Sequence, residues 1–152
     1  ASLGIPELSV FQPLKVGIMS TGDEVVDPGQ PISEGSIYDA NRYALVAAIS
    51  DLGCTVRDFG IVRDNTGHIA ETLRAAAKEC DVIISTAGMS VGEEDHLAAT
   101  LRLHGVVHFW KVAIKPGRPV AFGQIDGTPF LYGKENIINP KFIARGREPI
   151  RS

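Results

Sequence analysis

The chain has 152 residues, of which 44% are hydrophobic and 22% are charged, as is usual for a globular protein that buries the core of one domain. Its net charge is −3, and acidic and basic residues are interspersed, so the sequence has no basic stripe of the kind that binds nucleic acid. No apolar run approaches the roughly 20 residues of a membrane-spanning helix, so we expect neither nucleic acid nor a membrane as a partner.

The first third of the chain predicts a strand, a loop and a helix. Residues 14–20 are mostly apolar and typical of a strand, and a loop rich in proline and glycine follows. A helix is expected over residues 43–52, with Asp39 or Asn41 as the residue that caps its N-terminus. Gly53 stands where a glycine commonly ends a helix.

Strands and helices continue to alternate in the rest of the chain. Residues 54–62 and 81–85 are predicted strands, and the second is the continuous apolar run of a buried parallel strand. Between them, apolar residues at helical spacing predict a helix over residues 69–79, capped by Thr66. The remaining predicted elements are a helix over residues 95–104 closed by Gly105, strands over 106–114 and 120–122, and a hairpin turn at Asp126-Gly127 before residues 130–132.

This alternation predicts a three-layer α/β/α sandwich with a mostly parallel sheet. We expect the domain to span residues 14–133, with residues 1–13 as a lead-in from a preceding domain and residues 134–152 as an atypical, extended C-terminal tail. The sequence has no recognisable signal peptide, and Cys54 and Cys80 are isolated. We therefore expect reduced, buried thiols and a cytoplasmic protein.

Polar residues follow the first two predicted strands, at the end of the sheet where open α/β folds bind ligands. The first group could present hydroxyl and carboxylate groups around a glycine, or form an ordinary turn. It consists of Thr21, Gly22, Asp23 and Glu24. Asp64 follows the second strand and fits either a helix cap or a functional acid.

Two further groups come later in the chain. After the third strand, small residues and glycines would let a ligand approach the backbone, and three acids in succession end the loop. Its candidate residues are Ser85, Gly88, Ser90, Gly92 and Asp95. The last group is a rigid turn in which two cations suit phosphate or another anion, or are simply solvated. It consists of Lys115, Pro116, Gly117 and Arg118.

Together, these acids and cations predict a site with a metal-binding half and an anion-binding half. Carboxylate oxygens favour Mg²⁺ over softer metals, and a phosphorylated small molecule would satisfy both halves. The chain lacks the GxxxxGK[ST] and GxGxxG patterns, so a P-loop or Rossmann nucleotide site is not expected. Its four histidines are not spaced as a metal site.

Five segments in this order closely resemble the molybdopterin-binding domain of the molybdopterin molybdotransferase family, whose animal counterpart is the C-terminal part of gephyrin. They are residues 20–24 (STGDE), 37–41 (IYDAN), 60–64 (GIVRD), 90–95 (SVGEED) and 115–119 (KPGRP). The resemblance implies a three-layer α/β fold. It also implies an enzyme that takes adenylylated molybdopterin and molybdate, cleaves the adenylate with Mg²⁺, and leaves molybdenum on the pterin dithiolene.

The resemblance also implies roles for individual residues. Glu24, Asp64 and Asp95 match the family's functional acids, which would hold Mg²⁺, and Lys115 and Arg118 match its basic pair. Ser85, Gly88 and Ser90 match the loop that receives the pterin or its phosphate. The remaining substrate-binding candidates are Thr21, Gly22, Asp23, Gly92, Pro116 and Gly117.

The chain departs from the family pattern at three places. Ala87 replaces a glycine, Arg118 stands where lysine is common, and a Leu-Pro-Gly-Asn-Pro loop is missing after Tyr132. The family's other domains, which close the site across a dimer, are expected partners, and a homo-oligomer is possible. An isolated catalytic domain whose activity is weakened or lost is therefore expected. The alternatives are a non-catalytic pterin-binding or scaffold module and a molybdopterin adenylyltransferase.

Overall fold

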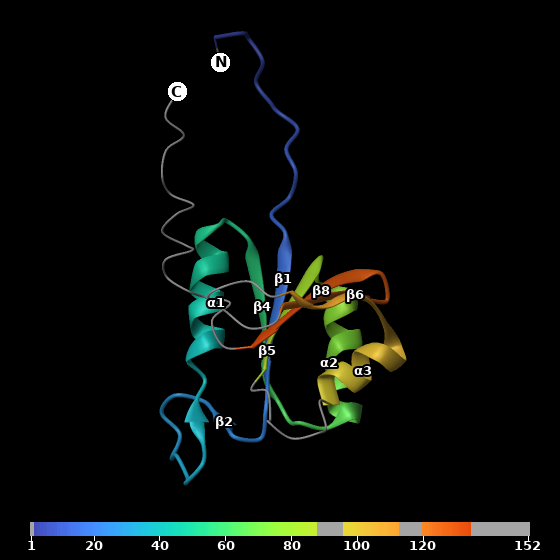
Figure 1. Ribbon diagram of the computed structural model, residues 1–152. Helices are drawn as coiled ribbons and strands as arrows, with labels where there is room; N and C mark the ends of the chain where they lie inside the picture. Colours follow the sequence, from blue (N-terminus) through green and yellow to red (C-terminus); the bar gives the residue numbers. More distant parts are fainter. Residues whose placement is uncertain (1, 88–95, 113–119, 135–152) are drawn as a thin grey trace.

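The computed structural model describes residues 2–87, 96–112 and 120–134. Its central feature is a six-stranded sheet that lies between helix α1 on one face and helices α2 and α3 on the other (Figure 1). The elements in chain order are β1 (Lys15–Thr21), β2 (Val25–Val26), β3 (Ile37–Tyr38), α1 (Ala40–Asp51), β4 (Thr55–Val62), α2 (Thr66–Glu79), β5 (Val82–Ala87), α3 (His96–His104), β6 (Gly105–Val112), β7 (Val120–Ile125) and β8 (Thr128–Lys134). The predicted three-layer sandwich is confirmed.

The strand order is β4-β1-β5-β8-β7-β6, and the sheet has a parallel and an antiparallel half. Strands β4, β1, β5 and β8 run parallel, whereas β7 pairs antiparallel with both β8 and β6. The predicted turn at Asp126-Gly127 joins β7 to β8, and both residues have positive φ angles of 49° and 83°. Those angles suit a two-residue hairpin, which is why Asp and Gly stand there.

The period-two alternation of side chains along the strands builds a core on each face of the sheet. Val16 and Ile18 of β1 pack with Leu45 of α1 in one cluster. Met19, the neighbour of Ile18, points the other way and packs with Ile69 and other residues of α2 and α3. Burying each such side chain contributes about 1.5–3 kcal/mol, so both helix layers are held on the sheet mainly by apolar contacts.

Helix α2 begins earlier than the sequence predicts. Its cap is Asn65, not Thr66, because the Asn65 Oδ1 atom accepts hydrogen bonds from the backbone N–H groups of Gly67 (2.9 Å) and His68 (3.3 Å). Thr66 is instead the first helical residue. Both predicted ends of α1 are confirmed: Asp39 caps α1, and Gly53 follows α1 with a φ of +80°.

Gly105 also has a different role from the expected one. It follows the last residue of α3, as predicted, but it is already the first residue of β6. A Cβ atom at this position would lie 2.5 Å from the backbone oxygen of Gln124 and 2.8 Å from Cδ1 of Ile125. The glycine is therefore needed for the close approach of β6 to β7.

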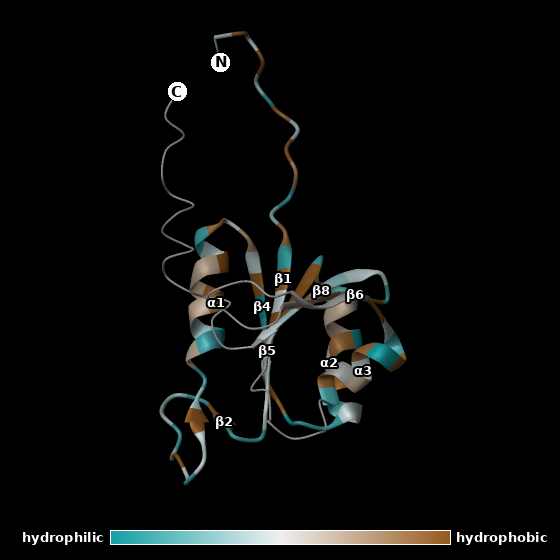
Figure 2. Cartoon of the chain, in the orientation of Figure 1, coloured by the Kyte–Doolittle hydropathy of each residue, from teal (hydrophilic) through white to brown (hydrophobic). Residues whose placement is uncertain are grey.

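Residues 2–14 contain no helix or strand and extend away from the sheet (Figure 1). Several large apolar side chains in this segment are fully exposed, including Leu3, Val10 and Phe11. Figure 2 shows hydrophobic colouring at several places along this segment, between more hydrophilic stretches. The predicted tail beyond residue 134 lies outside the described residues.

Candidate functional site

The parallel strands end together at one edge of the sheet. Thr21, the last residue of β1, lies opposite Val62 of β4 and Ala87 of β5, and Ala87 lies opposite Lys134 of β8. Helices α1 and α2 begin at this same edge, which is at the bottom of Figure 1. The first three predicted groups of polar residues follow β1, β4 and β5, so the fold brings their attachment points together, as expected for parallel strands.

The loop after β1 folds its carboxylate back onto its glycine. Thr21 and Gly22 are buried, Glu24 is half-buried and Asp23 is exposed. Gly22 has a φ of +138°, and a Cβ atom there would lie 2.7 Å from Oε2 of Glu24. The positive φ angle favours glycine here, and a side chain at this position would require the flexible Glu24 carboxylate to move away.

A hydrogen bond joins the loop after β1 to the loop after β4. The backbone N–H of Asp64 donates to Oδ1 of Asp23 over 3.2 Å. Asp64 is half-buried, and Asn65 caps the helix that follows. The cap function that Asp64 could have had therefore belongs to its neighbour, and the backbone of Asp64 lies at the sheet edge beside the Asp23 loop.

Ser85 brings a buried hydroxyl group toward the same end of the sheet. It is fully buried, and within the described part of the chain its Oγ atom has no hydrogen-bond partner. By contrast, the buried hydroxyls of Ser20 and Thr86 lie 2.7 Å apart and bond to each other. An unpaired buried hydroxyl costs about 1–3 kcal/mol, so Ser85 Oγ is available to a ligand or to a group that lies outside the described residues.

The other predicted site residues lie outside the described residues. They are Gly88, Ser90, Gly92 and Asp95 in the loop after β5, and Lys115, Pro116, Gly117 and Arg118 in the basic turn. In residues 2–87, 96–112 and 120–134, no three His, Cys, Asp or Glu side chains are placed to hold a metal ion together. The acid set Glu24, Asp64 and Asp95 thus stays a prediction, with two of its members in loops at the same edge.

A buried arginine near this edge was not among the predicted site residues. Arg42 of α1 donates from Nε to Oδ2 of Asp39 over 2.8 Å and from Nη1 to Oδ2 of Asp58 over 2.5 Å. Its Nη2 atom binds Oδ1 of Asp27. Burial by itself lowers the pKa of Arg42, but the hydrogen bond to Asp39 and the charges of Asp58 and Asp27 outweigh it and hold the pKa above its ordinary value.

Only one of these ion pairs had a signal in the sequence. Asp39 and Arg42 are three residues apart at the start of a helix, where an acidic cap and a following base commonly meet. Asp27 and Asp58 lie 15 and 16 residues from Arg42 in the chain, so only the fold brings them to it.

The two cysteines are both free thiols, as predicted. Cys80 is buried, whereas Cys54 is only partly buried. Burial and the nearby charge of Glu79 raise the pKa of the Cys80 thiol. Among the helices in the described part of the chain, none is both long and apolar enough to cross a membrane.

Comparison with known proteins places this arrangement in a family. Residues 17–140 match the model of a family described as a probable molybdopterin binding domain. The chain is 45% identical over 130 residues to a molybdopterin molybdenumtransferase of Haemophilus influenzae, covering 86% of this chain and 32% of that protein. It is 32% identical over 137 residues to gephyrin of Dictyostelium discoideum, covering 82% of this chain and 19% of gephyrin.

A solved structure supports the same relationship. The molybdopterin biosynthesis moea protein from Pyrococcus horikosii superimposes with a TM-score of 0.74 at 33% identity, covering 88% of this chain and 33% of that chain. This chain therefore spans about a third of the length of the Haemophilus and Pyrococcus proteins.

Proposed function

This chain belongs to the family of probable molybdopterin-binding domains, and from that premise we propose that it serves molybdenum cofactor biosynthesis by binding adenylylated molybdopterin at the carboxyl edge of its parallel strands. We further propose that it takes part there in the Mg²⁺-dependent insertion of molybdate, with release of AMP. The proposal uses the printed name of the Haemophilus relative, a molybdopterin molybdenumtransferase, for the class of reaction.

One observation carries the proposal: the hydrogen bond between Asp64 N–H and Asp23 Oδ1. It ties together two loops that each bring a carboxylate, Glu24 and Asp64, to the same edge of the sheet. Ligands of open α/β sheets bind beyond the carboxyl ends of the parallel strands, so the two acids lie where a small molecule is expected to bind. The Oγ atom of Ser85, two residues before the end of the neighbouring strand β5, adds a hydroxyl that lacks a partner in the described part of the chain.

The chemistry of these donors fits Mg²⁺. Carboxylate oxygens are hard ligands, and Mg²⁺ is commonly held by one or two carboxylates together with substrate phosphates. Glu24 and Asp64 would hold the ion together with Asp95, whose carboxylate is the third member of the predicted set. The ion, when bound, would neutralise negative charge on phosphate oxygens.

The chain's own residues would bind and orient the substrate. Gly22 leaves room for the Glu24 carboxylate close to the backbone of the turn, and the hydrogen bond from Asp64 to Asp23 keeps the Asp64 loop beside it. Ser85 would give its hydroxyl to the ligand, and Lys115 and Arg118 would pair with a phosphate or with molybdate. Such pre-placed charges favour a reaction because they need no rearrangement when charge develops.

The test is a calorimetric titration of the chain with adenylylated molybdopterin, with and without Mg²⁺, while AMP is measured. We expect binding that Mg²⁺ strengthens, together with AMP release when molybdate is present. Asp64→Asn is expected to abolish the effect of Mg²⁺, and Glu71→Gln, on the exposed face of α2, is the matched control that keeps it.

Each other result has a distinct meaning. Binding without AMP release would leave a pterin-binding module that needs partner domains for turnover. Consumption of ATP with molybdopterin would indicate adenylyl transfer instead. A chain that binds no adenylylated molybdopterin at any Mg²⁺ concentration would contradict the proposal.

A further inference from the structure

We propose that Arg42 is a positioning residue that holds the two acid-bearing loops of the site, those of Glu24 and Asp64, in a fixed relation to each other. The inference rests on the proposed function for what the two acids do. Arg42 itself lies in the first turn of α1, and its guanidinium group binds Asp39, Asp58 and Asp27. Its influence passes through two aspartates, Asp27 and Asp58.

The guanidinium group of Arg42 joins three separate elements. It binds Asp39 at the start of α1, Asp58 in β4, and Asp27 in the loop after β2. Arg42 is buried, and so is Asp39, while Asp27 and Asp58 are more exposed. Arginine carries donors on three nitrogens in a rigid plane, so it can bind three carboxylates in fixed directions, which the single ammonium group of lysine cannot do.

The first arm runs through Asp27 to the loop of Glu24. Asp27 directly follows β2, and it also accepts a hydrogen bond from the hydroxyl of Tyr43. Strand β2 is held by β3, because Ile37 N–H donates to the backbone oxygen of Glu24 (2.8 Å) and Asp39 N–H donates to that of Val26 (2.9 Å). Fixing Asp27 to Arg42 therefore fixes the far end of the short segment that begins at Gly22 and carries Glu24.

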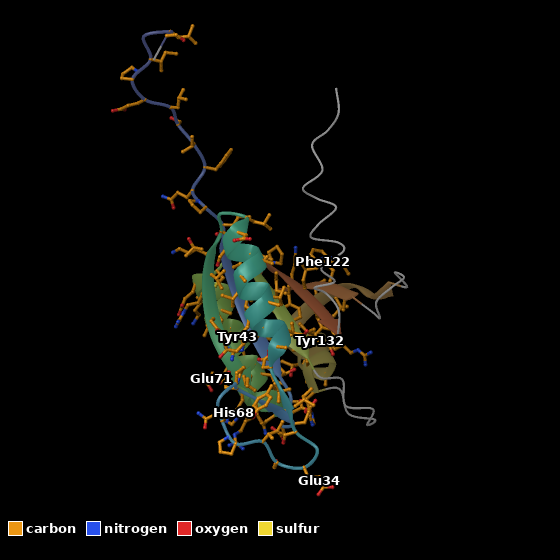
Figure 3. The ribbon with its side chains drawn as sticks, turned by 90° about the vertical axis from the view of Figure 1, so that its left-hand side faces the viewer. Glu34, Tyr43, His68, Glu71, Phe122 and Tyr132 are labelled. Carbon is orange, nitrogen blue, oxygen red and sulfur yellow. The ribbon has the colours of Figure 1, made fainter. Side chains whose placement is uncertain are left out.

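Figure 3 shows how this arm is arranged. Tyr43 lies on α1, and the loop that joins β2 to β3, with Glu34 on it, projects beyond the end of the helix. His68, near the start of α2, lies at the same end of the molecule. The Asp27–Arg42 ion pair is thus at the base of a projecting loop, where it ties that loop to the body of the fold.

The second arm runs through Asp58 to the loop of Asp64. Asp58 uses Oδ2 for Arg42 and Oδ1 to accept the N–H of Gly60 (2.8 Å), which has a φ of +72°. Here β4 contains a bulge: Ile18 lies opposite Asp58 and Ser20 opposite Ile61, so two steps along β1 match three along β4. Because side chains alternate along a strand, this extra residue decides which way residues 61–64 face.

The two arms meet again at the hydrogen bond between Asp64 N–H and Asp23 Oδ1. Arg42, Asp27, the Asp23 loop, Asp64 and Asp58 thus form a closed circuit of contacts behind the site. A closed circuit restrains the two loops more than either arm alone, because each arm restricts conformations that the other arm would still allow.

Arg57 offers a matched control for an arginine that has only a local role. It also lies in β4, pairs with one carboxylate, Glu79 (3.2 Å), and stacks over Phe59 at 5.2 Å, as Arg42 stacks over Tyr43 at 4.8 Å. Arg57 is exposed, however, and its partner is on α2. Arg57→Lys keeps the positive charge and removes the planar guanidinium from the Phe59 ring, and it removes no contact of either arm.

The test compares backbone amide spectra and hydrogen exchange of the whole chain in Arg42→Lys, Asp27→Asn, Asp58→Asn and Arg57→Lys. We expect Asp27→Asn to shift the amides of residues 22–26 and 37, and Asp58→Asn to shift those of residues 60–64. In Arg42→Lys both sets should shift, and the Asp64 amide should exchange about tenfold faster, as expected for a weakened charged hydrogen-bond network. Arg57→Lys should leave all of these amides unchanged.

Titration with Mg²⁺ alone, followed on the same amides, links the inference to the site. We expect Arg42→Lys to weaken the Mg²⁺ response of Gly22 and Asp64 about tenfold, while Arg57→Lys keeps it. If the unsubstituted chain shows no response to Mg²⁺, the metal part of the proposed function fails. The amide shifts of the variants measured without Mg²⁺ still test the role of Arg42. If Arg42→Lys does not fold, the two aspartate variants decide it.

Two outcomes would overturn the inference. One is an Arg42→Lys or aspartate variant in which the amides of residues 22–26 and 60–64 keep their shifts and exchange rates. The other is an Arg57→Lys variant that disturbs those amides as much as the Arg42 substitution does, because the effect would then be a general consequence of replacing an arginine in this region and would not come from the two arms.

Discussion

The backbone N–H of Asp64 donates a hydrogen bond to Oδ1 of Asp23 over 3.2 Å, although 41 residues separate the two in the chain. The contact spans from the end of β1 to the end of β4, two neighbouring parallel strands. Asp23 is therefore a bridge between loops as well as a polar residue at the sheet edge. The Asp23 carboxylate stabilises the loop that carries Asp64, so the position of Asp64 depends on that of Asp23.

Gly22 should tolerate no side chain. We expect Gly22→Ala to lower the free energy of unfolding by about 1–3 kcal/mol, because a φ of +138° strains any residue other than glycine and because the new Cβ, 2.7 Å from Oε2 of Glu24, would also displace that carboxylate. Urea denaturation measures this change. Gly29→Ala is the control, since Gly29 has a φ of +91° but open space around the new Cβ, so it carries backbone strain without the collision. An equal loss in both variants would show that the Glu24 contact contributes nothing.

Ser85 and Ser20 should respond in opposite directions to the same substitution. Ser85→Ala removes a buried hydroxyl that has no partner in the described part of the chain, so we expect stability to stay the same or to rise by about 1 kcal/mol. Ser20→Ala breaks the 2.7 Å hydrogen bond to Thr86 and leaves that hydroxyl unpaired, so we expect a loss of about 1–3 kcal/mol. Denaturant midpoints of the two variants, with equal m-values, give the comparison. A marked loss of stability in Ser85→Ala would mean that its Oγ is already paired.

If the basic turn predicted from the sequence binds anions, its contribution to ligand affinity should depend on the salt concentration. We expect Lys115→Ala and Arg118→Ala each to weaken the binding of phosphate-bearing ligands about tenfold at low ionic strength, because each removes a charged hydrogen-bond donor. The difference from the unsubstituted chain should shrink as salt is added, since screening weakens the lost attraction. Titration at two salt concentrations tests this, with Lys78→Ala, in the last turn of α2, as the control. Equal affinities at low salt would exclude an anion-binding role for the turn.

Cys80 should react far more slowly with iodoacetamide than Cys54. Cys80 is buried, and burial raises the pKa of its thiol, so its reactive thiolate is scarce near neutral pH. Raising the pH should speed its modification, and mass spectrometry of the alkylated peptides follows both residues at once.

The same shift predicts a dependence of stability on pH. The pKa of Cys80 is raised in the folded state, so its contribution to stability is fully present below the unfolded value of about 8.5 and is lost as pH rises through the folded value. Cys80→Ala should remove this part of the alkaline loss of stability. An unchanged slope of stability against pH in that variant would contradict the assignment.

The sequence alone determined the elements and much of the fold, because those depend on local patterns. The alternation of Ile18 and Met19 marks a strand with two buried faces, and Gly53 and Asp126-Gly127 stand where the backbone takes positive φ angles. The cap at Asp39 was also within reach, since capping involves neighbours in the chain. A strand order with parallel neighbours then places polar residues after β1, β4 and β5 at one edge.

Only the tertiary structure decided the contacts between residues that are distant in the chain. The partners of Arg42, the hydrogen bond from Asp64 to Asp23, and the close approach of β6 to β7 at Gly105 leave no periodic pattern in the sequence. The bulge at Gly60 could not be predicted either, because one extra residue changes the facing of residues 61–64 without changing the composition of the strand. Local patterns thus say which residues form a strand or a helix, whereas the register of one strand on another and the packing of a charged side chain depend on the whole fold.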